Sequence, residues 1–283
     1  MLKIEHRITP HLIKLLEGIA GATTLIKSAR LQASLKMPLE RDAFARSVHS
    51  STWIEGNLLS LAQVRMISEG QDVLVEQKQK LEVANCLEAM RWILKNKTKS
   101  VTEKGLLEVH GRMIKGLLTN ERAGKYRVVQ NYIVDARKKI IFTPPVPAKV
   151  KARMKELFVW LKKEDAHTIV RSAVFHHEFL TIHPFVDGNG RVARAVSQWL
   201  LWEKGFDPLC TLGLDDFFAQ NRTRYYDMIQ QARDMDGDYT HWVEYFAEGL
   251  ARSIEMVEGR IKEGSLKLQG VVLTPKQDEL LAL

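Results

Sequence analysis

The clearest chemical pattern in the chain is a run of twelve residues. It reads His183-Pro184-Phe185-Val186-Asp187-Gly188-Asn189-Gly190-Arg191-Val192-Ala193-Arg194. A proline cannot extend the helix before it, and the Asp-Gly-Asn-Gly stretch tolerates a sharp backbone turn. The next helix, expected to begin around Arg191, would present free backbone N–H groups, which bind anions. Two arginines in its first turn oppose the helix dipole unless an anion is bound. The run therefore predicts a polyphosphate site.

A histidine and a carboxylate complete the predicted site. An imidazole at His183, beside a bound phosphate, can take a proton from an incoming hydroxyl group. The carboxylate of Asp187 would repel the phosphate unless a divalent cation bridges the two. Mg²⁺ binds in this way, through one carboxylate together with phosphate oxygens and waters. We therefore expect His183 to be a general base and Asp187 to be a metal ligand.

The run resembles the signature of the Fic family, HPFx(D/E)GNGRxxR, at every specified position. The resemblance implies a nucleotidyltransferase that moves a nucleotide monophosphate, usually AMP from ATP, to a protein hydroxyl group. It implies the same roles for His183 and Asp187. The residues that it places around the triphosphate are Gly188, Asn189, Gly190, Arg191 and Arg194. The glycine and asparagine positions would hold the α-phosphate, and the arginines would hold the β- and γ-phosphates, since electrostatic positioning is the main catalytic resource in phosphate chemistry.

A predicted β-hairpin also resembles part of this family. Residues 128–134 and 140–142 are apolar and β-branched, and two prolines follow them, so they predict a hairpin that must lie against a helical body. Together with the preceding Gly124-Lys125-Tyr126-Arg127, the hairpin resembles the family's flap, which aligns the target segment. The flap residues that would border the nucleotide are Asn131, Tyr132, Ile133 and Val134. From the pattern alone, a simple structural flap is an equal alternative.

A tyrosine pair is the third point of resemblance. Tyr225 and Tyr226 resemble the family's pair near the adenosine, although they could equally be ordinary core aromatics. Where relatives often carry Asn, seven residues after the second tyrosine, this chain has Arg233. That departure leaves the adenine and ribose contacts open. In all, the resemblance covers roughly residues 40–250.

The segment Ser51-Thr52-Trp53-Ile54-Glu55-Gly56 resembles the family's inhibitory motif, (S/T)xxxE(G/N). Ser51 and Glu55 are one helical turn apart on the same face. A carboxylate at a helix C-terminus is disfavoured by the dipole, and the buried cation of Arg194 would offset this. Glu55 would then take the place where Arg194 holds the γ-phosphate, so ATP would bind in a pose unsuited to in-line attack. The alternative is an exposed glutamate next to the glycine that ends the helix.

Composition bounds the class of protein. The 283 residues are 45% hydrophobic and 27% charged, with six Trp and ten Phe, which excludes a disordered chain. Two cysteines exclude a disulfide framework and a CxxC zinc pair. The expectation is a cytoplasmic protein, because no signal peptide and no membrane-length apolar run is visible. The net charge of +8 suits a phosphate site, but interspersed Lys and Arg are more typical of solvated helix faces than of a nucleic-acid surface.

Helical periodicity dominates the rest of the chain and predicts a mostly α fold, a Fic-type helical bundle with a small β-hairpin flap. The expected helices are 10–35, 39–55, 60–69, 75–95, 102–118, 147–164, 166–181, 191–204, 214–234 and 238–262. The expected parts are an N-terminal helical region (1–100) with the inhibitory helix at about 39–56, a catalytic core (101–250), and a C-terminal helix (251–283). The last part resembles, from Leu273, the opening of a truncated winged-helix module. His176-His177-Glu178 is no zinc-protease motif, because HExxH would need a histidine where Thr181 stands.

The leading hypothesis is a self-inhibited protein adenylyltransferase that uses ATP and Mg²⁺. One alternative is removal of AMP from a modified protein, with Glu55 orienting a water. A second is a non-catalytic nucleotide-sensing or DNA-associated regulator, against which the intact His183 argues. Transfer of phosphate or phosphocholine would keep a similar histidine, but the complete GNGRxxR set favours a full triphosphate. The expected partners are ATP and a protein with a Tyr, Thr or Ser hydroxyl. A homo-oligomer is possible, no membrane is expected, and nucleic acid is expected only if a complete winged-helix module follows.

Overall fold

The computed structural model describes residues 4–28, 33–134, 137–163, 165–206, 213–235 and 237–269. Within them the chain forms helices and one small antiparallel sheet, so the predicted mostly α fold with a hairpin is confirmed. The elements are α1 (Pro10–Ser28), α2 (Ala33–Ile54), α3 (Leu61–Ser68), α4 (Gln77–Asn96), α5 (Glu103–Met113), β1 (Ile133–Val134), β2 (Ile140–Phe142), α6 (Pro147–Lys163), α7 (Thr168–Ile182), α8 (Asn189–Glu203), α9 (Leu214–Gln220), α10 (Arg222–Asp234) and α11 (Thr240–Gln269).

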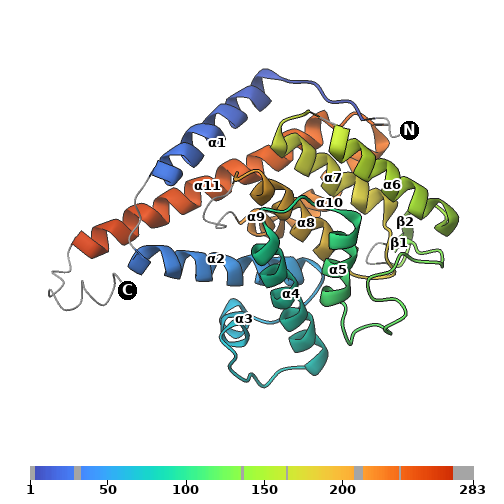
Figure 1. Ribbon diagram of the computed structural model, residues 1–283, viewed down its shortest axis with the longest axis horizontal. Coiled ribbons are helices and arrows are strands. Elements are labelled where there is room, and N and C mark those ends of the chain that lie inside the picture. The colour runs from blue at the N-terminus through green and yellow to red at the C-terminus, as the bar shows by residue number, and fades with distance from the viewer. Residues whose placement is uncertain are drawn as a thin grey trace.

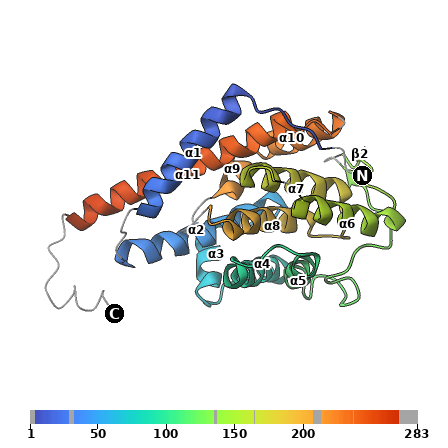
Figure 2. The ribbon, with the colours of Figure 1, turned by 45° about the horizontal axis from the view of Figure 1, so that its top comes forward.

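Helices α7 and α8 form the centre of the molecule. They pack against each other, and nearly every residue of both is buried, including polar side chains such as His176 and Arg194. Around them, α2 packs against α9, α3 and α4, while α5 lies along α4 and α6 lies along α7. The long helices α1 and α11 lie side by side on one flank (Figure 1, Figure 2). The central pair is therefore held on all sides by other helices.

The turn between α7 and α8 brings the twelve-residue signature to one point. Helix α7 ends at Ile182, and His183 adopts a left-handed conformation with φ 51° and ψ 58°. Gly188, with φ 81°, then precedes the first residue of α8, Asn189. The helix therefore begins two residues before the predicted start at Arg191. The reason is local, because the left-handed glycine completes the turn and lets the Asn189 backbone enter the helix at once.

Several other predicted helix boundaries were wrong. The helix predicted over 10–35 ends at Ser28, and the next begins at Ala33, so Pro38 lies inside α2 and not at its start. A proline this close to a helix start removes a single backbone hydrogen bond, and the packing of α2 outweighs that loss. The helix predicted over 214–234 is two helices, because the Asn221 side chain accepts the Arg224 N–H and starts α10. The helix predicted over 102–118 ends at Met113, before a chain of tight turns.

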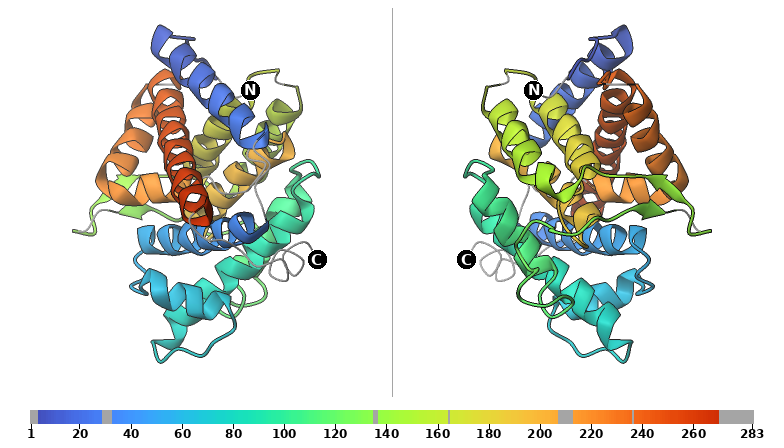
Figure 3. Two further views of the ribbon diagram at one scale, coloured as in Figure 1. Left: turned by 90° about the vertical axis from the view of Figure 1, so that its left-hand side faces the viewer. Right: turned by 90° about the vertical axis from the view of Figure 1, so that its right-hand side faces the viewer.

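The hairpin is shorter than predicted. Only Ile133–Val134 and Ile140–Phe142 pair, with an irregular register, and residues 128–132 form no strand. Side chains there satisfy backbone carbonyls in place of a ladder. Arg127 donates to the Val129 carbonyl, and Gln130 donates to the carbonyls of Asn131 and Pro144. The hairpin lies at the edge of the helical body (Figure 3).

The predicted three-part division stays a prediction. The boundary at residue 100 falls between α4 and α5, and the one at residue 250 falls within α11. The predicted start of a winged-helix module, from Leu273, lies outside the described residues. No helix in the part of the chain that the structure describes has the length and apolar character needed to cross a membrane.

Candidate functional site

A cavity of about 830 Å³ lies where the end of α2, the hairpin, the α7–α8 turn and α10 meet. The predicted site residues that line it are Glu55, Tyr132, Ile133, Val134, His183, Gly190, Arg194, Tyr225 and Tyr226. The predicted site residues outside its lining are Ser51, Asn131, Asp187, Gly188, Asn189 and Arg191. The structure thus brings the histidine, the start of α8, the second arginine, the flap and the tyrosine pair to one space.

His183 lies in this cavity with one ring nitrogen free. Its Nδ1 is 3.2 Å from the Leu180 carbonyl oxygen, which can only accept a hydrogen bond, so Nδ1 carries the proton. The lone pair of Nε2 is then available to a substrate proton. Burial lowers the pKa of His183 to about 4, although the hydrogen bond to Leu180 opposes this shift. The ring is therefore a neutral proton acceptor at neutral pH.

Arg127 holds the backbone that carries His183. A non-glycine residue in a left-handed conformation costs about 1–3 kcal/mol and persists only where its surroundings fix it. The Arg127 Nε donates to the His183 carbonyl at 2.9 Å, and the Arg127 backbone N–H donates to the Pro184 carbonyl at 2.8 Å. Its other two nitrogens donate to the carbonyls of Val129 and Pro145. One buried guanidinium therefore joins the signature turn to the flap, a role that the sequence analysis missed.

His110 supports the same turn from α5, and the sequence analysis also missed it. The Gly124 N–H donates to His110 Nδ1 at 3.0 Å, so Nε2 carries the proton and donates to the Asp187 carbonyl at 3.1 Å. The ring stacks on Phe185 with centroids 3.6 Å apart and planes 1° from parallel. Burial lowers the pKa of His110 to about 4, which keeps it neutral. A lone histidine inside a predicted helix gave no signal of this role.

The two asparagines of the predicted nucleotide site bind protein backbone. The Asn189 side chain accepts the Phe185 N–H and donates to the Phe185 carbonyl, both at 2.9 Å. Asn131 donates to the same carbonyl at 3.0 Å. The side chains therefore fasten the signature turn, which leaves the backbone N–H groups of residue 189 and its neighbours to meet an anion. The predicted nucleotide contacts of Asn131 and Asn189 stay predictions.

Arg194 is the buried cation of the site. Its Nε donates to Ser51 Oγ at 2.9 Å, and its Nη2 donates to the Ser51 carbonyl and to Glu55 Oε1, each at 2.8 Å. Its Nη1 is buried without a hydrogen-bond partner. A Cβ built on Gly190 would lie 3.1 Å from that nitrogen, so Nη1 lies beside the first turn of α8. A buried, unpartnered donor next to a helix N-terminus is a place for an anion.

Glu55 contacts Arg194 from just beyond the last residue of α2. Burial would raise the pKa of Glu55, but the Arg194 guanidinium lowers it by a larger amount, so the net pKa shift is downward. The Glu55 side chain is 35% exposed, and it opens onto the cavity, whereas that of Arg194 is 1% exposed. A Cβ at Gly190 would clash with Glu55 Oε1, so the carboxylate lies directly against the start of α8. The carboxylate therefore lies between the Arg194 guanidinium and the first turn of α8.

Asp187 and Arg191 form the outer side of the turn. Arg191 Nη2 is 3.4 Å from both carboxylate oxygens of Asp187, whose side chain is 57% exposed. No group of three or more His, Cys, Asp and Glu side chains among the described residues could hold a metal by itself. A single exposed carboxylate at an anion-binding helix start nevertheless fits Mg²⁺, which binds through one carboxylate, phosphate oxygens and waters. The donor set therefore suits a metal that arrives with a phosphate.

The tyrosine pair divides between core and cavity. Tyr225 is buried, and its hydroxyl group is 2.7 Å from His176 Nε2, while His177 contacts the Ile229 carbonyl, so both histidines are core residues as expected. Tyr226 is 40% exposed and borders the cavity.

Arg233, the residue that departs from the family resemblance, lies between the hairpin and the end of α7. Its guanidinium carbon is 3.9 Å from the ring centroid of Phe142, and its Nη2 donates to the Leu180 carbonyl at 3.2 Å. Burial lowers its pKa to about 10. The cation therefore remains charged at neutral pH, and it ties the hairpin to the end of α7.

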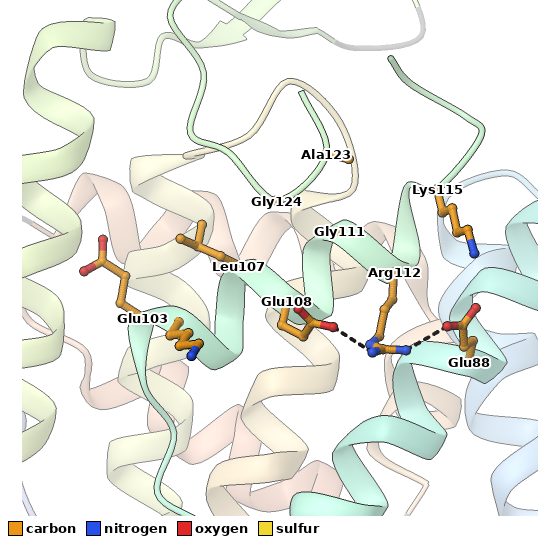
Figure 4. Close-up of a pocket in the computed structure, with 10 residues that line it drawn as sticks. Glu88, Glu103, Leu107, Glu108, Gly111, Arg112, Lys115, Ala123 and Gly124 are labelled. Atoms are coloured by element: carbon orange, nitrogen blue, oxygen red, sulfur yellow. Dashed lines mark hydrogen bonds and ion pairs between the residues drawn. The ribbon is translucent and has the colours of Figure 1, made fainter. Parts of the chain in front are cut away.

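A second cavity, of about 690 Å³, lies on α5 beside the loop that contains Gly124 (Figure 4). Its central cation, Arg112, is paired with Glu88 and Glu108, each at 2.7 Å. The cavity contains no predicted site residue. Two carboxylates thus match the charge of its arginine, and no histidine of the described chain lines it.

The chain is similar in sequence to known proteins. Residues 100–201 match the family model described as Fic/DOC family, so this part of the chain is a Fic/DOC domain. The chain is 32% identical over 235 residues to "Protein adenylyltransferase Fic" of Culex quinquefasciatus, covering 80% of this chain and 44% of that protein. It is 30% identical over 252 residues to "Protein adenylyltransferase fic-1" of Caenorhabditis elegans, covering 85% and 47%. The chain thus spans about half the length of the curated relatives that it matches.

Solved structures agree on the fold. A Fic family protein from Desulfovibrio desulfuricans superposes with a TM-score of 0.80 at 26% identity, covering 92% of this chain and 77% of that one. Fic-1 from Caenorhabditis elegans superposes with a TM-score of 0.74 at 26% identity, covering 89% and 73%. The Fic-type helical bundle is therefore shown over most of the chain.

Proposed function

We propose that this protein is an adenylyltransferase that transfers AMP from ATP to a hydroxyl side chain of a protein, and that Glu55 inhibits it from within the same chain. The observation that carries the proposal is Arg194 Nη1, a buried donor without a partner at the start of α8, in the same cavity as the neutral base His183. The relatives named as protein adenylyltransferases support this activity. A location in the cytoplasm is part of the proposal and rests on the sequence.

The residues present account for the chemistry. The target hydroxyl oxygen attacks the α-phosphorus as Nε2 of His183 takes its proton, and the bond to the β-phosphate oxygen breaks to release pyrophosphate. Backbone N–H groups at the start of α8 and the guanidinium of Arg194 hold the phosphates in line. Asp187 would hold Mg²⁺, which when bound neutralises phosphate charge. The exposed apolar residues of the hairpin, Ile140 and Ile141 among them, would align the target segment.

Glu55 opposes this arrangement by charge and by position. Its carboxylate and a terminal phosphate are both anions that need the same guanidinium. With Glu55 bound to Arg194, ATP can enter only in a pose that leaves its γ-phosphate elsewhere, and the α-phosphorus is then out of line with the attacking oxygen. The inhibited state is therefore a property of one ion pair between α2 and α8.

The experiment supplies α-labelled or γ-labelled ATP with Mg²⁺ and cell lysate. Glu55→Gly should label itself or a target strongly from the α-position only, and wild type should label weakly. Adding His183→Ala to Glu55→Gly should abolish labelling, since loss of a general base costs on the order of 10²–10⁴-fold in rate. Glu40→Gly, in the first half of α2, is the control and should behave as wild type. Transfer of the γ-label, or labelling that persists without His183, would contradict the proposal.

Arg194→Ala separates inhibition from a merely structural helix. The variant loses the partner of Glu55 and the partner of the phosphate together, so it should stay inactive. Glu55→Gly combined with Arg194→Ala should be as inactive as Arg194→Ala alone. An active double variant would show that Glu55 does not act through Arg194.

Removal of AMP is the second candidate, because the Glu55 carboxylate lines the same cavity as His183 and could orient a water. An AMP-modified target made with Glu55→Gly distinguishes the two. Release of AMP by wild type but not by Glu55→Gly would favour removal, whereas release by neither would leave Glu55 as an inhibitor only.

A further inference from the structure

We propose that Asp215 is a positioning residue for Arg194, which keeps the guanidinium aimed at the triphosphate when the Glu55 carboxylate is absent. The inference rests on the proposed function and extends it to a residue that no motif of the sequence contains. Asp215 lies in the first turn of α9, which packs against α2, and its side chain is 4% exposed.

The contacts of Asp215 orient it from two sides. Its Oδ1 is 3.7 Å from Arg194 Nε, and its Oδ2 accepts a hydrogen bond from Ser47 Oγ at 2.7 Å. Ser47 is in turn 3.4 Å from the side-chain nitrogen of Gln198 on α8. The carboxylate is therefore fixed between α2 and α8, with one oxygen facing the arginine.

Three hydrogen bonds of Arg194 go to the end of α2 and to the residue that follows it. Two hydrogen bonds go to Ser51 and one goes to Glu55. Any movement of the end of α2 that withdraws Glu55 also puts the Ser51 contacts at risk. Asp215 lies on α9 and is oriented by Ser47, two turns before the end of α2, so its charge stays beside the guanidinium when only the end of α2 withdraws.

The geometry also explains how a buried carboxylate can help an anion site. Asp215 approaches Nε, on the edge of the guanidinium away from Nη1. A planar guanidinium held by one edge has its remaining N–H groups directed at fixed positions. Nη1 then keeps its place beside Gly190, where a phosphate would accept from it. Ser51 Oγ accepts the Nε hydrogen, and Asp215 attracts this edge of the guanidinium by charge, so it does not compete for the donor that the phosphate needs.

The test compares ATP and AMP binding, because only ATP carries the phosphates that Arg194 would hold. Equilibrium binding of each nucleotide with Mg²⁺ is measured on Glu55→Gly and on the same protein with Asp215→Asn. Asp215→Asn removes the charge that lies 3.7 Å from Arg194 Nε, so the guanidinium loses part of its orientation and ATP binding should weaken by about tenfold. AMP affinity should change by less than about threefold, which a general loss of structure would not spare.

Asp216→Asn is the matched control. Asp216 is the next residue, it accepts from Ser50 of α2 at 2.5 Å and pairs with Arg46 at 3.0 Å, and so it matches Asp215 in charge and in contact with α2. Asp216→Asn, made in the Glu55→Gly protein, should prefer ATP over AMP as strongly as Glu55→Gly itself does. If Asp215→Asn fails to fold, Ser47→Ala removes the hydrogen bond that orients Asp215 and should lower the ATP preference in the same direction.

Two results would overturn the inference. One is an ATP preference that survives both Asp215→Asn and Ser47→Ala, and the other is an equal loss in Asp216→Asn. A Glu55→Gly parent with no preference for ATP over AMP would instead overturn the triphosphate site itself, and the role of Asp215 with it.

Discussion

At the scale of single residues, His183 combines a left-handed backbone conformation with an imidazole whose pKa is lowered. The left-handed backbone turns the chain between two helices, and the proton on Nδ1 is held by Leu180. Burial lowers the pKa of the ring to about 4, so protonation, which removes the Nε2 lone pair, occurs only on the far acid side of neutrality. We therefore expect the base to be available throughout the physiological range.

An NMR titration of the ring nitrogens tests this. The His183 signals, assigned by their loss in His183→Ala, should stay those of neutral imidazole from pH 8 down to about 5 and should shift near pH 4. Because the unfolded chain takes up this proton at its ordinary pKa of about 6.5, the associated stability is present above that pH and is lost as the pH falls towards 4. A midpoint near 6.5 in the folded protein would contradict the expectation.

Asp187 gives a second prediction at this scale. In the Glu55→Gly background, Asp187→Ala should lose transfer and should also lose the tightening of ATP binding that Mg²⁺ brings. Calorimetric titration of ATP with and without Mg²⁺ measures both affinities. Asp227→Ala, a carboxylate elsewhere on the cavity wall, is the control and should keep the difference. An unchanged effect of Mg²⁺ in Asp187→Ala would exclude Asp187 as the ligand.

At the scale of elements, Arg127 connects the α7–α8 turn with the flap, and a lysine cannot replace its several donors. Arg127→Lys in the Glu55→Gly background should lower transfer by up to about 10²-fold, the cost of a small misplacement of a catalytic group, while ATP affinity changes little. Amide exchange in residues 128–134 should become faster. Arg122→Lys, an exposed arginine in the preceding loop, should change neither. Unaltered transfer and exchange in Arg127→Lys would show that the turn holds His183 without help.

The same scale shows what the sequence could predict. The signature turn was predicted almost to the residue, because proline, glycine and asparagine determine its backbone locally. The Pro38 and hairpin predictions were wrong because tertiary contacts overrode local preference, as Arg127 and Gln130 do for residues 128–132. His110 acts on the turn through contacts with residues more than seventy positions away, which periodicity alone does not reveal.

At the scale of the whole molecule, the site is an assembly of distant segments. Glu55 and Arg194 are 139 residues apart in the sequence and meet only because α2 crosses the start of α8. Their pairing could be expected from the resemblance, whereas Asp215 could not, since its place depends on how α9 packs against α2. Near its middle, α2 is tied to α11 by the ion pair between Asp42 and Arg260. Glu55 thus follows a helix that is anchored well before its end.

This arrangement links stability to nucleotide binding, and the last prediction follows from that link. Glu55→Gly leaves buried Arg194 with one anion fewer, so the melting temperature of the nucleotide-free protein should fall. The loss of unfolding free energy should be below the ~3–5 kcal/mol lost when a fully buried ion pair is broken, because the Glu55 side chain is 35% exposed. Each 1 kcal/mol lowers the melting temperature by about 2–4 °C.

MgATP should reverse the loss. A ligand at a hundred times its dissociation constant adds about 2.7 kcal/mol to the stability of the folded state, so ATP should raise the melting temperature of Glu55→Gly more than that of wild type, where the carboxylate still competes. Thermal melts at matched ATP concentrations measure both. The ATP-induced shift of Glu40→Gly should equal that of wild type. The melting temperature of Glu55→Gly with Arg194→Ala should rise no more with ATP than with AMP. Two anions that compete for one buried cation must make the ATP-induced shift smaller in wild type than in Glu55→Gly. Equal shifts in the two proteins would therefore mean that the carboxylate and the phosphate do not share one arginine.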